Sequence, residues 1–160
     1  MRVHLIQSRE LFGPPERQEE LREVWRRNEG LFDKYTFPEG RPTFTELFAL
    51  CGPGINVIAN SDIYFEHFTS IAWIRKWAER AFVALCTGQP EVLALSRYDV
   101  DPEGVAMLWN NADSQDCWVV FGGPIQIDAP YTMGQPGCDN ALIHALTVAG
   151  FTVTNPSKTI

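Results

Sequence analysis

Apolar and polar residues are arranged along this chain so that strands and helices are predicted in turn. Short apolar runs typical of buried strands occupy residues 3–6, 55–59, 91–96, 117–121 and 151–153. Helical spacing of apolar residues is found between them, at residues 16–28, 44–51, 67–85 and 139–149. This alternation favours an α/β fold of the Rossmann-like kind, a mainly parallel sheet with helices on both faces. A length of 160 residues fits one domain, residues 1–160.

The boundaries of these elements carry their own signals. Thr43 with Glu46 three residues later forms a capping-box pattern, and Gly30 is expected to be the C-cap residue of the first helix. Asp139 or Asn140 is expected to cap the last helix. Residues 31–40 are expected to be loop or a weak strand, and residues 101–113 a polar loop.

Polar clusters stand beside the predicted strands. Three of them follow a strand: Gln7-Ser8-Arg9, Asn60-Ser61-Asp62 and Arg97-Tyr98-Asp99. Ligands of parallel α/β sheets bind beyond the carboxyl ends of the strands, so these clusters are candidates for a common site. A fourth cluster, Ser114-Gln115-Asp116, precedes its strand, and this argument alone does not bring it to the same edge.

Composition and charge narrow the function classes. The net charge of −7 opposes a protein that grips nucleic acid over its whole surface, and it leaves room for a divalent cation. The four cysteines show no C-x-x-C spacing, which predicts reduced, mostly buried thiols and no zinc site. There is neither a signal-peptide pattern nor an apolar stretch of membrane-spanning length, so a cytoplasmic location without a membrane span is expected.

The residue types in these clusters suggest particular chemistry, and each has a simpler alternative. Oxygens of Asn60 and Asp62 could meet one Mg²⁺ or Mn²⁺ that shares a diphosphate, or the segment is a strand-ending turn. Asp116 could bind a sugar hydroxyl or belong to a loop that caps a strand. Asp139 could take a proton from an acceptor hydroxyl or serve only as a cap. Arg41 could meet a phosphate or be solvated.

Several separated motifs recur together in one known family. They are Arg41-Pro42-Thr43-Phe44, residues 56–65 (NVIANSDIYF), residues 94–99 (ALSRYD), residues 114–121 (SQDCWVVF), Gly137-Cys138-Asp139-Asn140 and Asn155-Pro156-Ser157. In this order they resemble small glycosyltransferase-like proteins of bacteria, phages and other viruses. The resemblance covers about residues 41 to 160.

The resemblance implies a GT-A fold, a Rossmann-like sheet that binds nucleotide-sugars, and a hexosyltransferase-type enzyme. It places Asn60-Ser61-Asp62 where the family has a D-x-D element that holds Mn²⁺ or Mg²⁺ and the diphosphate; Asn in the first position weakens metal affinity. It makes Asp139 the catalytic base. The substrate-binding residues that it implies are Arg41, Thr43, Asn60, Ser61, Arg97, Ser114, Gln115, Asp116 and Asn140.

The leading hypothesis is therefore an enzyme that transfers a sugar from a nucleotide-diphosphate donor to a hydroxyl acceptor. A non-catalytic nucleotide- or sugar-binding module on the same fold is the alternative, favoured by Asn60 and by the absence of the family's late histidine after Asn155. A nucleotidyltransferase is a third possibility, but no Gly-rich phosphate loop follows the first strand.

Overall fold

A computed structural model describes residues 1–109 and 114–157 of the chain. Its centre is a six-stranded sheet in the order β2-β1-β3-β7-β4-β8. The strands are β1 (Val3–Gln7), β2 (Lys34–Thr36), β3 (Ile55–Ala59), β4 (Glu91–Leu95), β7 (Cys117–Phe121) and β8 (Thr152–Thr154). The predicted α/β class is confirmed, and residues 34–36, expected to be loop or weak strand, form an edge strand.

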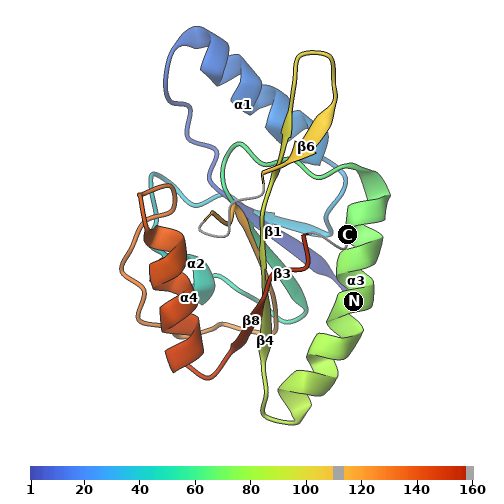
Figure 1. Cartoon of the computed structure of the whole chain (residues 1–160), viewed down its shortest axis with the longest axis vertical. Helices are drawn as coiled ribbons and strands as arrows, with labels where there is room; N and C mark the ends of the chain where they lie inside the picture. Colours follow the sequence, from blue (N-terminus) through green and yellow to red (C-terminus); the bar gives the residue numbers. More distant parts are fainter. Residues whose placement is uncertain (110–113, 158–160) are drawn as a thin grey trace.

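Helices cover both faces of this sheet, as predicted (Figure 1). The helices on the faces are α2 (Phe44–Ala49), α3 (His67–Cys86) and α4 (Cys138–Val148), whereas α1 (Pro15–Asn28) stands beyond one end of the strands. The face packed against α3 contributes Leu5, Val57 and Val119 to one core cluster. The face packed against α2 and α4 contributes Ile6, Ile58 and Trp118 to the other. Side chains of successive strand residues point to opposite faces, which is why the central strands are mostly apolar and β7, with the sequence CWVVF, is apolar throughout.

Strand β7 runs antiparallel to both of its neighbours, β3 and β4, whereas all other pairs in the sheet are parallel. The sheet is therefore mixed and mostly parallel. Because β7 is reversed, the residues before it lie where the other five strands end. We call this side of the sheet the carboxyl edge. The reversal brings Ser114-Gln115-Asp116 to the carboxyl edge, which the sequence argument had left open.

The segment after β4 differs from the prediction. Residues 101–113 were expected to be a polar loop, but residues 98–108 contain a two-stranded antiparallel hairpin of β5 (Tyr98–Val100) and β6 (Ala106–Leu108). Residues 110–113 of the predicted loop lie outside the described residues. The hairpin stands beyond the carboxyl edge beside α1, at the top of Figure 1. Its three-residue strands are too short to show a convincing two-residue periodicity.

The helix ends confirm one predicted cap and correct another. Thr43 accepts from the Glu46 backbone N–H, and the Glu46 carboxylate accepts from the Thr43 N–H, which is the predicted capping box. Asp139 is not an N-cap, because Gly137 holds that position with a positive φ of 79°, and Asp139 lies inside the first turn. Glycine takes this left-handed conformation without steric cost, and the helix starts at Cys138, two residues earlier than an Asp139 cap would allow.

Two expectations about the whole chain can be compared with the described residues. No helix in the described part of the chain is both long and apolar enough to cross a membrane. All four cysteines are free; Cys51, Cys117 and Cys138 are buried, but Cys86 is exposed at the end of α3.

Candidate functional site

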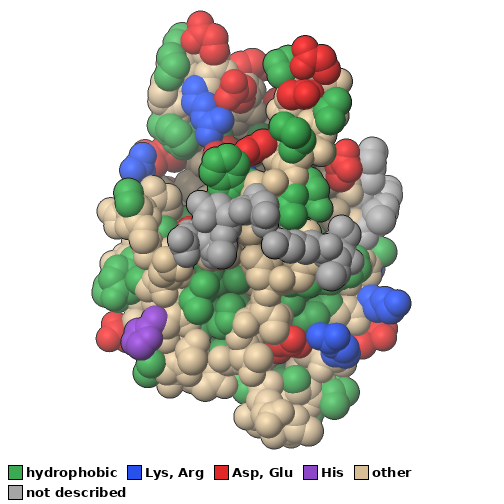
Figure 2. All heavy atoms as spheres, in the orientation of Figure 1, with side chains coloured by type: hydrophobic (Ala, Val, Ile, Leu, Met, Phe, Trp, Pro, Cys, Tyr) green, Lys and Arg blue, Asp and Glu red, His purple; other side chains and the backbone are tan. Residues whose placement is uncertain are grey.

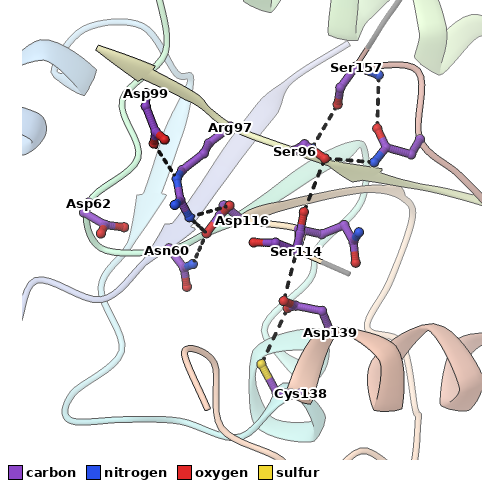
Figure 3. Close-up of polar contacts among 12 residues, drawn as sticks. Asn60, Asp62, Ser96, Arg97, Asp99, Ser114, Asp116, Cys138, Asp139 and Ser157 are labelled. Atoms are coloured by element: carbon purple, nitrogen blue, oxygen red, sulfur yellow. Dashed lines mark hydrogen bonds and ion pairs between the residues drawn. The ribbon is translucent and has the colours of Figure 1, made fainter. Parts of the chain in front are cut away.

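A chain of polar contacts crosses the carboxyl edge from β3 to the hairpin (Figure 3). The Asn60 side-chain amide donates to Asp116 Oδ1 at 2.8 Å, and the Asn60 backbone N–H donates to the Asp116 carbonyl at 3.0 Å. Arg97 donates to both oxygens of the Asp116 carboxylate, at 3.3 and 3.4 Å. Three of the predicted clusters thus meet at Asp116, which is only 6% exposed.

Arg97 is itself fixed from three sides. Its Nε donates to Asp99 Oδ1 at 2.7 Å, and its guanidinium lies 5.1 Å from the centre of the Trp109 ring. Together with Asp116, these contacts hold a half-buried cation at the base of the hairpin. Arg97 is therefore a preorganised positive group rather than a freely moving one.

The third residue of the Asn60-Ser61-Asp62 cluster has a partner that sequence reasoning missed. Asp62 Oδ2 accepts from Arg17 at 2.6 Å, and Arg17 also pairs with Glu20 on the same helix. Arg17 is the third residue of α1, a helix crowded with charged residues, so nothing in its sequence context marks it. Its place is set by the packing of α1 beyond the carboxyl edge.

A cavity of about 280 Å³ lies at this junction. It is lined by the ends of β1 and β3, by the start of α1 and by the loop before α2. Its lining includes Asn60, Ser61, Asp62, Arg17 and Arg41. Phe12, from the loop before α1, and Gly40, from the loop before α2, also line it. Figure 2 shows charged side chains of both signs over α1. We call this the polar cavity.

A second cavity, of about 510 Å³, lies beside the polar cavity and shares Asp62 with it. Most of its wall is apolar or aromatic, with Phe65, Trp73 and Tyr98 contributed by three different elements. Arg97 and Asp116 are among its polar lining residues. We call it the aromatic cavity. Its volume lies within the usual range of about 300–1,000 Å³ for small-molecule sites.

Asp139 lies at the carboxyl edge but apart from the Asn60–Asp116 contact (Figure 3). Its carboxylate accepts from the Gln115 backbone N–H at 3.4 Å and lies 3.5 Å from the Cys138 thiol. It is not among the described residues that line either cavity. Asp116 interacts electrostatically with both Asp62 and Asp139, so the three carboxylates belong to one charged neighbourhood.

Burial changes the proton affinity of two of these carboxylates. Loss of hydration raises the pKa of Asp116; the hydrogen bond from Asn60 and the charge of Arg97 oppose the shift. Burial likewise raises the pKa of Asp139, against the hydrogen bond from the Gln115 backbone. A carboxylate whose pKa is raised holds a proton more readily, which is the property that a general base requires.

The remaining predicted substrate-binding residues are not brought to the cavities. Thr43 caps α2 and lines neither cavity. The Ser114 carbonyl accepts from Ser96, which ties the start of β7 to the end of β4. Gln115 is buried, and its backbone contacts Asp139. Asn140 is exposed on α4. Their predicted roles in substrate binding stay predictions.

The described residues do not fit a preformed cation site. No group of three or more His, Cys, Asp or Glu side chains close enough to hold a metal is found among the residues that the structure describes. One predicted ligand is engaged elsewhere, since the Asp62 carboxylate accepts from Arg17. Asn60, whose NH2 group donates to Asp116, offers a cation a carbonyl oxygen that carries no charge. A cation at Asp62 would lie against the Arg17 guanidinium and be repelled by it.

Comparison with known proteins adds no assignment to this geometry. No protein-family model matches the chain, and no curated protein matches it either.

Proposed function

We propose that the protein is a glycosyltransferase of GT-A type that transfers a sugar from a nucleotide-diphosphate donor to a hydroxyl acceptor. The observation that carries the proposal is the meeting of separated polar clusters at one sheet edge. Asn60, Arg97 and Asp116 are in direct contact there, although 19 to 56 residues separate the bonded pairs. In α/β proteins this edge is where ligands bind, and it adjoins two cavities.

The cavities suit the two chemically different parts of such a donor. The polar cavity presents Arg17 and Arg41, cations that match the charge and the oxygen geometry of a diphosphate. Ser61 adds a hydroxyl to the same lining. The neighbouring aromatic cavity offers flat apolar surfaces and the polar groups of Arg97 and Asp116, which suits a ring that carries hydroxyl groups.

In the proposed reaction one bond forms, one bond breaks and one proton is transferred. The acceptor oxygen attacks the anomeric carbon of the donor, and the bond from that carbon to the diphosphate oxygen breaks. The nucleoside diphosphate leaves with the electron pair of the broken bond. Asp139 takes the proton from the acceptor hydroxyl, and its raised pKa favours this step. Asp116 with Arg97 would orient sugar or acceptor hydroxyls.

A turnover assay tests the proposal. Nucleotide-sugars with different bases and sugars are incubated with the protein, and release of nucleoside diphosphate is measured. We expect release with at least one donor, and a loss of roughly 10²–10⁴-fold in the Asp139→Asn variant. Asn preserves the size of the side chain, and Gly137 holds the cap position, so stability should hardly change. Unchanged turnover in Asp139→Asn would remove the base assignment.

A binding module without turnover is the second candidate. The observation that favours it is that Asp62 and Asp116 are both held by arginine partners, while Asp139 lines neither cavity. Under this alternative, donors bind with measurable affinity, but no diphosphate is released from any of them.

A further inference from the structure

Arg17 and Arg41 are placed to do the work that a divalent cation does in many diphosphate sites. Both line the polar cavity, although one comes from α1 and the other from the loop before α2. Both guanidiniums also lie over the ring of Phe12, at 5.8 and 5.9 Å from its centre. One aromatic side chain of the lining is thus within cation–π distance of two cations.

The anionic groups of this cavity explain how the arginines are held. Asp62 and Glu10 are the carboxylates in its described lining. Asp62 accepts from Arg17 at 2.6 Å, and the pair is partly exposed, with side-chain exposures of 41% and 34%. Ion pairs at such exposure are weak because water screens them. A diphosphate carries more charge and offers more acceptor oxygens than one carboxylate, so it can compete for the Arg17 guanidinium.

We infer that the polar cavity binds the diphosphate of its ligand through Arg17 and Arg41, without a requirement for a divalent cation. The inference rests on the proposed function and adds how the negative charge is neutralised. It accounts for a feature that a cation site would not have, an arginine on the carboxylate expected to hold the metal. It also agrees with Asn60, which brings no negative charge to a cation.

Isothermal titration of the whole chain tests the inference. The probes are the diphosphates of adenosine, cytidine, guanosine and uridine, each in EDTA and in Mn²⁺. We expect at least one to bind in EDTA with an affinity within about threefold of that in Mn²⁺, since the arginines supply the positive charge. Arg17→Gln and Arg41→Gln should each lower the affinity in EDTA by about ten- to a hundredfold, the usual worth of a hydrogen bond to a charged group.

Three further variants sharpen the result. Arg22→Gln is the matched control, because Arg22 lies on the same helix and pairs with Glu19 away from the cavity; its affinity should match that of the wild type. Arg17→Lys keeps the charge but loses the planar fork, so an intermediate affinity is expected. Asp62→Asn keeps an acceptor for Arg17 and removes a negative charge, so affinity in EDTA should hold or rise. Equal denaturation midpoints establish that each variant is folded.

The possible failures are distinguishable. Binding that appears only in Mn²⁺, and is lost in Asp62→Asn, overturns the arginine inference and leaves the proposed function standing. Arg17→Gln that binds as well as Arg22→Gln also overturns the inference. If none of the four diphosphates binds in either condition, the proposed function and the inference fall together.

Discussion

Two asparagines four residues apart stand at the two ends of strand β3, Asn56 within it and Asn60 directly after it, and their surroundings differ completely. Asn56 is fully buried, and its amide is used by the protein itself. Its Oδ1 accepts from the Gly52 N–H at 2.9 Å, and its Nδ2 donates to the carbonyls of Gly52 and Gly122 at 2.9 and 3.0 Å. Asn60, at the carboxyl edge, donates to Asp116 and lines the polar cavity.

The comparison shows how the same side chain serves structure at one end of a strand and a candidate site at the other. The turns around Asn56 approach closely: a Cβ added to Gly54, whose φ is 104°, would lie 2.9 Å from the Arg2 carbonyl oxygen. The residues around Asn60 instead enclose cavities. A segment with every polar group used internally has little left to bind a ligand, whereas a cavity lined with charged groups has much.

Substitution of the two asparagines gives the largest expected contrast in stability. Asn56→Ala leaves several buried backbone groups without partners, and we expect it to lower the free energy of unfolding by about 2–5 kcal/mol. Asn60→Ala removes one bond to a partly buried pair and should cost about 1 kcal/mol. Chemical denaturation of both variants measures the difference. Equal losses would mean that Asn60 is as structural as Asn56.

The pH dependence of stability should differ between the carboxyl edge and the Asn56 end of β3. At the carboxyl edge the larger effect is expected from Asp116. Because burial raises the pKa of Asp116, the folded state holds its proton more tightly than the unfolded state does. Its contribution to stability is therefore full below about pH 4, the ordinary value for Asp, and is lost as pH rises through the raised pKa. Asp116→Asn should flatten this part of the unfolding free-energy profile.

If Asp116→Asn and the wild type lose the same free energy of unfolding over this pH range, the raised pKa of Asp116 is contradicted. Burial raises the pKa of Asp139 in the same direction, so its contribution to stability is likewise lost as pH rises through the raised pKa. The Asp139→Asn variant should therefore be measured beside it, so that the two contributions are separated.

We expect the smallest effect of pH on stability, and one of opposite sign, from His4. This residue lies next to Asn56, away from the carboxyl edge. Its ring lies 3.1 Å from Asn56 Oδ1 and 2.8 Å from the Thr36 hydroxyl. Burial lowers the pKa of His4, so its contribution to stability is present above about pH 6.5 and is lost as pH falls through the lowered pKa. His4→Gln is denatured at several pH values between about 4 and 8, a range that includes the ordinary pKa of His. Its free energy of unfolding should not show this loss. A profile unchanged from the wild type would place the protonation elsewhere.

The strands and helices with strong periodicity could be predicted from the sequence. The runs at 55–59 and 117–121 are apolar, with Asn56 as the exception, because both of their faces are buried, and Trp118 is fully buried as the pattern required. The capping box at Thr43 was visible because it is a local pattern of two residues. By contrast, the hairpin of β5 and β6 is too short for periodicity to reveal it.

The candidate site was predictable in part, and the reason is again physical. Clusters that follow strands share an edge whenever the strands are parallel, so Asn60 and Arg97 were correctly expected to lie near each other. The direction of β7 decides where Asp116 lies, and strand direction leaves no mark in the residues of a short apolar run. Arg17 was missed because its contact with Asp62 depends on how α1 packs, 45 residues away in the chain.

Hydrogen–deuterium exchange with and without a bound nucleoside diphosphate tests the central claim most directly. The claim is that the carboxyl edge binds this ligand and that the end of β3 near Asn56 only supports it. We predict protection on binding at residues 40–42, 60–62 and the start of α1, with no change at residues 52–56 and 122. Protection confined to residues 52–56 and 122, with none at residues 60–62, would contradict the account.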